Sequence, residues 1–148
     1  MSATILKLIP TNPEFIPEPQ AQEEALYILR TTMTPSCMIR VVISDDIQFI
    51  DQGQNWEHVF CPACDQQIDE WWTHAMDIAH AEKFQNLEVQ VPRCGKTCLL
   101  NNLIYAWPAG FARCVIEVEN PAILLSDGQR RLVEEKLGCE LRAIWAHY

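Results

Sequence analysis

The chain has 148 residues and a mass of 17.0 kDa, which suits one domain of ordinary size. Hydrophobic residues make up 49% of the chain and charged residues 21%, so it can bury a core, and extensive disorder is excluded. The net charge of −9 argues against nucleic acid or an anionic membrane as the main partner. We therefore expect a single folded domain, residues 1–148, that needs no disulfide scaffold.

The apolar content of the N-terminus stops at Pro10, so no signal-peptide core is expected. The longest uncharged stretch, Thr97 to Ala112, is shorter than the roughly 20 apolar residues of a membrane-spanning helix. The seven cysteines cannot all pair within the chain. Free thiols or a metal site in the reducing cytoplasm are therefore expected.

The N-terminal part of the chain predicts a strand, a helix and a second strand. The first strand is expected at Thr4–Ile9, followed by a proline-rich loop that begins near Asn12-Pro13. A helix from about Gln20 to Thr31 follows, with apolar residues on one face. The β-branched content of Met38–Ser44 predicts the second strand.

The middle of the chain predicts short strands around one helix. Asp45-Asp46 is expected to turn the chain back into a strand at Ile47–Asp51, and a second turn should lead into Trp56–Phe60. A helix is expected from about Gln66 to Phe84, because apolar residues recur there at helical spacing: Ile68, Trp71, Trp72, Ala75, Met76 and Ala79. A strand is expected at Leu87–Val91, whereas Leu99–Tyr105 fits either a helix or a strand.

The C-terminal part repeats the order strand, Asn-Pro, loop, helix and strand. A strand at Ala112–Val118 precedes a helix that Ser126 caps and Gly138 ends, and Leu141–Trp145 returns as a strand. The likeness of the two ends suggests an internal duplication. We predict an α+β fold: a single domain with a mixed sheet of about six or seven strands, three helices and a zinc-ribbon-like knuckle inserted at about residues 52–103.

Two cysteine pairs have the spacing of zinc ligands. Cys61-x-x-Cys64 follows a predicted strand, and Cys94-x-x-x-Cys98 follows after 29 intervening residues. The helix and strand between the pairs can return the chain to the first knuckle. Four thiolates form a closed tetrahedral shell, so we predict a structural zinc ion bound by Cys61, Cys64, Cys94 and Cys98.

Three alternatives remain open for these cysteines. They can be ordinary buried thiols, like those expected at Cys37, Cys114 and Cys139. Cys61 and Cys64 can form a redox pair, although Asp65 beside them would raise a thiolate pKa. A three-sulfur site completed by His58 would leave room for a small zinc-dependent hydrolase.

The negative charge is concentrated in one segment. Residues 44–92 contain ten acidic residues and one basic residue, so their net charge of −9 equals that of the whole chain. This segment is either a solvated acidic face or a surface that docks a basic protein. The residues expected to contact such a partner are acidic or aromatic: Asp45, Asp46, Asp51, Glu57, Asp69, Glu70, Trp56 and Trp72. The indoles could equally lie at the boundary of the core.

Several strings together resemble a family of small uncharacterised bacterial proteins, some of which carry transporter-ATPase labels. These strings are Asp51-x-Gly53-x-Asn55, Cys61-Pro-x-Cys64, Trp71-Trp72, Trp107-Pro108-x-Gly110-Phe111-Ala112-Arg113 and Leu141-Arg142-x-Ile144-Trp145-Ala146-x-Tyr148. The resemblance implies no established activity and no catalytic residues. A Pro-Cys-Cys-Gly string is usual in the family where this chain has Pro92-Arg93-Cys94-Gly95, and this departure bears on Cys98 as the fourth ligand.

The hypothesis that best combines these features is a non-enzymatic, zinc-stabilised bacterial protein-binding module. Its acidic segment, residues 44–92, would dock a basic protein, and an immunity protein or inhibitor of a bacterial toxin would fit. The alternative is the small zinc enzyme with a mixed Cys/His site. Neither nucleic acid nor a membrane is expected as a partner.

Overall fold

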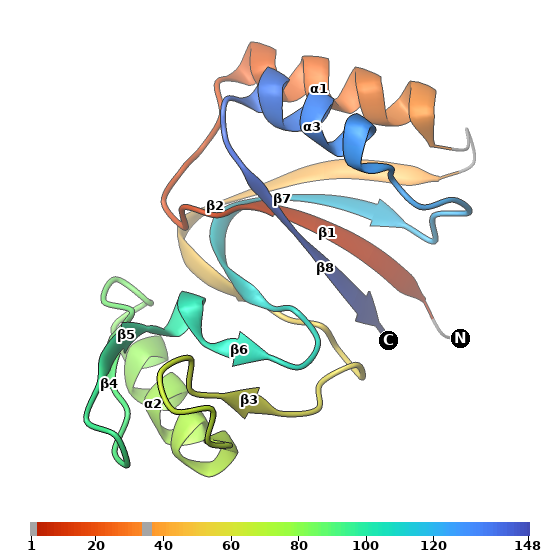
Figure 1. Cartoon of the computed structure of the whole chain (residues 1–148). Coiled ribbons are helices and arrows are strands. Elements are labelled where there is room, and N and C mark those ends of the chain that lie inside the picture. Colours follow the sequence, from red (N-terminus) through yellow and green to blue (C-terminus); the bar gives the residue numbers. More distant parts are fainter. Residues whose placement is uncertain (1–2, 34–36) are drawn as a thin grey trace.

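The structure, a computed structural model, describes residues 3–33 and 37–148 (Figure 1). Its largest layer is a four-stranded antiparallel sheet with the order β2-β7-β1-β8. These strands are β1 (Thr4–Pro10), β2 (Met38–Ile50), β7 (Gly110–Glu119) and β8 (Leu141–His147). The helices α1 (Pro19–Thr32) and α3 (Asp127–Leu137) cover one face of this sheet (Figure 1). No helix in the described ranges is long and apolar enough to cross a membrane.

The two ends of the chain form interleaved strand-helix-strand units. β1 and β2 flank β7, and β7 and β8 flank β1, so a strand of the other unit separates the strands of each unit. This is the split β-α-β arrangement of ferredoxin-like folds. The strand, helix and strand expected at each end are present, and the α+β fold class is confirmed.

Local sequence signals explain where α3 begins and ends. The Ser126 side chain accepts a hydrogen bond from the Gln129 backbone N–H, and the Gln129 side chain accepts one from the Ser126 N–H. Gly138 ends the helix with a φ of 80°, a left-handed conformation that glycine adopts without strain. Both helices bury one face against the sheet, through Ala25 and Leu29 on α1 and through Val133 and Leu137 on α3.

β2 is longer than the sequence predicts, and the turn expected at Asp45-Asp46 is wrong. The strand continues to Ile50, with a register shift against β7 between Ile43 and Gln48. A bulge therefore absorbs the extra residues of β2, and the Arg113 guanidinium donates a hydrogen bond to the Ser44 carbonyl there. The turn preference of the Asp-Asp pair is overridden because β2 pairs with β7 on both sides of it.

The connection between β2 and β7 forms a separate layer, which we call the insert (residues 51–109). It contains β3 (Val59–Phe60) paired with β6 (Ile104–Tyr105), and β4 (Glu88–Gln90) paired with β5 (Thr97–Leu99). Between these lie the helix α2 (Asp69–Ala81) and a 3₁₀ turn, η1 (Leu100–Asn102). The strands thus form one antiparallel sheet and two short ladders instead of one mixed sheet of six or seven strands. Figure 1 shows the insert beyond the end of the sheet, away from α1 and α3.

α2 is shorter than its apolar periodicity indicates, although the face that it buries is the predicted one. Ala75 and Ala79 are buried, and the insert has its own hydrophobic core. The predicted C-terminal turn is absent because Lys83 and Phe84 have φ values of 58° and 55°, which no right-handed helix accommodates. Phe84 instead packs edge-on against Phe111 of β7 and joins the insert to the sheet.

A polar network fixes the insert to the termini of the chain. The buried Lys7 ammonium donates to the Asp51 carbonyl at 3.0 Å, to Asp51 Oδ1 at 3.2 Å and to the Tyr148 hydroxyl at 2.7 Å. The Tyr148 hydroxyl donates to Asp51 Oδ2, which also accepts the Gly53 N–H. Gly53 has a φ of +57° and forms a bridge with His147. We call Lys7, Asp51 and Tyr148 the attachment network.

Candidate metal centre

The first knuckle is a tight turn that presents two thiols. The Cys61 N–H donates to the Gln66 carbonyl at 2.9 Å, and the Asp65 N–H donates to the Cys61 carbonyl at 2.9 Å. Asp65 has a φ of 59°, so the chain turns sharply after Cys64. The Ala63 N–H also donates to Cys61 Sγ at 3.4 Å. These bonds give the Cys61-x-x-Cys64 turn the form of a metal knuckle, as its spacing predicts.

A second knuckle of the same form occupies residues 91–96, which the cysteine spacing alone does not indicate. The Val91 N–H donates to the Lys96 carbonyl at 2.9 Å, and the Gly95 N–H donates to the Val91 carbonyl at 2.8 Å. Gly95 has a φ of 71°, as Asp65 has 59° in the first turn. Cys94 therefore corresponds to Cys64, and Val91 takes the place of Cys61.

The sequence does carry a signal for this correspondence. Cys61-Pro-Ala-Cys64 and Val91-Pro-Arg-Cys94 share a proline at the second position and a cysteine at the fourth. The spacing of the cysteines alone does not reveal this repeated turn, because the second turn begins with valine. Both first residues are fully buried, with 0% of Cys61 and 0% of Val91 exposed.

The two knuckles bring three thiols together. The Sγ atoms of Cys61, Cys64 and Cys94 all lie within 4.8 Å of one another. The Sγ atoms of Cys61 and Cys94 are 3.7 Å apart, far beyond the length of a disulfide. Zinc–sulfur bonds of about 2.3 Å place tetrahedral thiolates roughly 3.8 Å apart. The group is therefore compatible with a metal ion.

Cys98 lies near this group without belonging to it. It is half-buried on β5, opposite Val89 of β4. Burial raises the pKa of the Cys98 thiol, and the neighbouring Cys61 and Cys94 raise it further. The structure therefore gathers three of the four predicted ligands and places the fourth beside them.

The two thiols of the first knuckle differ in acidity. Burial opposes ionisation of Cys61, but hydrogen bonds from the backbone of Cys64 and Ala63, and then from the thiols of Cys64 and Cys94, lower its pKa. For Cys64, a backbone hydrogen bond at Gln66 favours the thiolate, yet burial and the two neighbouring thiols leave its pKa raised. The local hydrogen bonds therefore favour the thiolate form at Cys61 more than at Cys64.

His58 does not join the cysteine group in the described part of the chain. Its Nδ1 lies 2.8 Å from Asp69 Oδ2, and the Val59 N–H donates to Asp69 Oδ1 at 2.8 Å. Burial opposes ionisation of Asp69, but hydrogen bonds from Val59, His58 and Gln67 outweigh it and lower the pKa of the carboxyl. The pair ties the chain before the first knuckle to the start of α2. The mixed Cys/His enzyme site stays a prediction without support from this arrangement.

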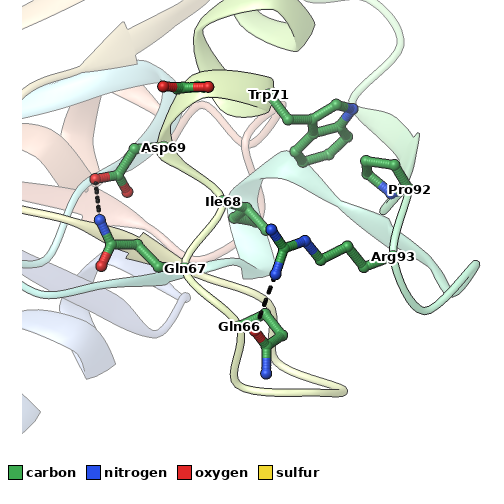
Figure 2. A pocket seen from close by; sticks show the side chains of 8 residues that line it. Gln66, Gln67, Ile68, Asp69, Trp71, Pro92 and Arg93 are labelled. Carbon is green, nitrogen blue, oxygen red and sulfur yellow. Dashed lines mark hydrogen bonds between the residues drawn. The ribbon is translucent and has the colours of Figure 1, made fainter.

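A cleft of about 510 Å³ lies beside the knuckles, at the start of α2. Figure 2 shows the Trp71 indole beside Pro92, and the Arg93 guanidinium extending across the cleft toward Gln66. Arg93 donates to Gln66 Oε1 at 3.3 Å and so connects the two knuckle segments. No sequence pattern predicts this cleft, because its walls come from two segments that meet only in the folded chain.

The acidic residues predicted to bind a partner divide into two kinds. Asp51, Asp69 and Glu57 form internal contacts; the Glu57 carboxylate accepts the Trp107 indole N–H at 3.2 Å. Glu70 is exposed and lines the cleft. Asp46 lines a hollow of about 390 Å³ beside the C-terminal end of α2, and its neighbour Asp45 is exposed.

Trp56 and Trp72 contact each other instead of standing separately at the surface. Their rings stack with centroids 4.6 Å apart, and both pack against the core of the insert. The Trp72 indole N–H donates to the Tyr105 hydroxyl at 3.2 Å. These two indoles thus lie at the core boundary, and Trp71 is the tryptophan of α2 that lines the cleft.

The remaining cysteines belong to the sheet and helix layer. Cys114 is buried in β7, and Cys37 and Cys139 are half-buried beside the core under α1 and α3. Burial, with a smaller contribution from Cys139, raises the pKa of Cys114 to about 11. No cysteine in the described residues forms a disulfide.

Comparisons with known proteins identify no relative. No protein-family model, curated protein or solved structure matches the chain. The resemblance to the bacterial family therefore stays a prediction.

Proposed function

We propose that the chain is a zinc-stabilised protein-binding module whose insert docks a basic protein partner. Cys61, Cys64 and Cys94 would hold the zinc ion with Cys98, and the residues of the acidic segment would contact the partner. A bacterial toxin directed at nucleic acid is one kind of basic partner, for which the module would act as an immunity protein or inhibitor. A reducing compartment such as the cytoplasm suits the thiols of Cys61, Cys64 and Cys94, which form no disulfide with one another.

The choice of zinc follows from the ligand chemistry. Thiolates at the corners of a tetrahedron favour zinc over magnesium or calcium, which prefer oxygen ligands. The insert has only short ladders and one helix, so a metal that joins its two knuckles would cross-link segments that little regular secondary structure connects. Its role would therefore be structural.

The observation that carries the docking proposal is the number of unpaired acidic side chains. The described residues form three ion pairs, and these include only Asp51 and Asp69 of the ten acidic residues in segment 44–92. Glu70 and Asp77 are exposed along α2, which lies far from the helix layer (Figure 1). A concentrated field of one sign accelerates and orients the approach of an oppositely charged protein.

The test compares two charge-reversed variants of the tagged protein, expressed in its own bacterial host. Glu70→Lys/Asp77→Lys changes the proposed surface, whereas Glu24→Lys/Glu135→Lys reverses two exposed acidic residues elsewhere. Native mass spectrometry of the purified wild type reports bound metal and any retained protein. Association rates of the purified partner are then measured with each variant at low and high salt.

We expect one zinc ion and a retained basic protein with the wild type. The Glu70→Lys/Asp77→Lys variant should bind this partner roughly tenfold more slowly at low salt and lose most of the salt dependence. The control variant should bind at the wild-type rate. An unchanged rate and salt dependence for the α2 variant, or an acidic partner, would contradict the docking proposal; a metal-free protein would contradict the zinc centre.

A further inference from the structure

The two knuckles share their backbone form but differ at the first ligand position. Both turns close with the same pair of backbone hydrogen bonds, both continue into a residue with positive φ, and both bury their first side chain. The first knuckle offers two thiols, whereas the second offers only Cys94, because Val91 fills the remaining ligand position. A hydrocarbon side chain cannot bind a metal, so the knuckles together fix three ligands.

We infer that Cys98 closes the centre as an exchangeable fourth ligand, and that metal enters and leaves through this position. The inference rests on the zinc centre of the proposed function. It concerns which ligand is replaceable, whereas the proposed function concerns what the insert binds.

Two features suit Cys98 to this role: it lies beside the three-thiol group, and the strand that carries it belongs to a short ladder. It packs against the same core of the insert as the other three cysteines and lies on the strand that follows the second knuckle, but it is outside the three-thiol group. The three fixed thiols lie in turns closed by hydrogen bonds. Cys98 instead belongs to a ladder of three residue pairs, from Glu88–Leu99 to Gln90–Thr97. Such a short two-stranded ladder is marginally stable by itself, so β5 can move toward the metal or away from it.

Burial separates Cys61 from the other three thiols. Cys61 is 0% exposed and sits against the core of the insert, whereas Cys64, Cys94 and Cys98 are all half-buried. Among these three, Cys98 differs by lying outside the knuckle turns. Dissociation of Cys98 would leave three thiolates and one open position, in contrast to a fully closed structural site.

The experiment uses the full chain loaded with zinc or with cobalt as a spectroscopic substitute. Three variants are compared with the wild type: Cys98→Ser, Cys64→Ser, and the double variant Val91→Cys/Cys98→Ser. Native mass spectrometry measures the bound metal, cobalt absorption reports the number of thiolate ligands, and an excess of chelator measures the release rate. Circular dichroism confirms that each variant is folded.

We expect Cys98→Ser to keep one metal ion, to lose about one quarter of the thiolate–cobalt absorption and to release zinc at least about tenfold faster. Val91→Cys/Cys98→Ser should regain the four-thiolate spectrum and release zinc more slowly than Cys98→Ser. Cys64→Ser should lose the metal under conditions in which Cys98→Ser retains it.

A measurement on the unmodified protein gives an independent test. In the zinc-loaded wild type, a limiting amount of iodoacetamide should label Cys98 before Cys61, Cys64 and Cys94, as mapped by peptide mass spectrometry. Wild-type spectrum and release rate in Cys98→Ser would show that Cys98 is not a ligand. Complete metal loss in Cys98→Ser, as in Cys64→Ser, or equal labelling of the four thiols, would show that it is not exchangeable. Wild type without metal would overturn the zinc centre itself and this inference with it.

Discussion

Removing the negative charge of Asp51 should destabilise the fold by more than its position near the surface suggests. The Lys7 side chain is 8% exposed, whereas that of Asp51 is 43% exposed. Asp51→Asn preserves the size of the side chain but leaves the Lys7 ammonium buried with only neutral acceptors, the Asp51 carbonyl and the Tyr148 hydroxyl. The expected loss of stability therefore comes from the buried Lys7 charge, which loses its ionic partner.

Known magnitudes set the expected size of this effect. Breaking a buried ion pair costs about 3–5 kcal/mol, and a hydrogen bond to a charged group contributes about 1.5–3 kcal/mol. Because two acceptors remain and Asp51 is partly exposed, we expect a loss of about 2–3 kcal/mol in the free energy of unfolding. For a chain of this length, that loss lowers the Tm by roughly 5–10 °C.

Thermal and guanidinium unfolding of the purified protein measure the effect, with circular dichroism as the signal. The matched control is Lys7→Met/Asp51→Asn, which removes both charges. It should be at least about 1 kcal/mol more stable than Asp51→Asn because no unpaired charge remains buried. A cost below about 1 kcal/mol for Asp51→Asn, or a double variant less stable than Asp51→Asn, would show that the unpaired Lys7 charge is not the source of the destabilisation.

The pH dependence of the free energy of unfolding gives a second test of the attachment network. Burial opposes ionisation of Asp51, but the Lys7 charge and hydrogen bonds from Tyr148, Lys7 and Gly53 outweigh it and lower the pKa of the carboxyl. A lowered pKa in the folded state contributes stability above the unfolded-state pKa of about 3.9. This contribution is lost as the pH falls through the folded-state pKa. Asp51→Asn should therefore show a weaker loss of stability below about pH 4 than the wild type.

Three further changes test other parts of the fold. Gly53→Ala would place a Cβ 2.4 Å from the His147 carbonyl oxygen at a φ of +57°. The unfolding midpoint should therefore fall by an amount equivalent to about 2 kcal/mol or more. Gly128→Ala is the control, because nothing lies near the Cβ that it adds. Ser126→Ala removes the cap of α3 and should cost about 1 kcal/mol in the same assay, whereas Ser126→Asp should restore most of it. Removal of zinc by a chelator should accelerate amide hydrogen exchange in α2, β4 and β5 while β1 and β7 stay protected; equal acceleration throughout would contradict a metal role confined to the insert.

Features that depend on neighbouring residues can be predicted from the sequence of this chain. The capping box at Ser126 and the left-handed Gly138 lie where the local pattern predicts, because their hydrogen bonds span only a few residues. The buried face of α2 follows from helical periodicity for the same reason. The Cys61-x-x-Cys64 turn likewise closes on its own backbone.

Features that join distant segments depend on how the whole chain folds, and local patterns do not predict them. Pairing with β7 carries β2 through Asp45-Asp46, where local propensity predicts a turn. The role of Val91 becomes visible only when its turn is compared with that of Cys61, because valine carries no sign of a ligand position. Lys7, Asp51 and Tyr148 meet across almost the whole length of the chain. Such contacts depend on which strands lie side by side, and the alternation of apolar residues along one strand does not specify its neighbour.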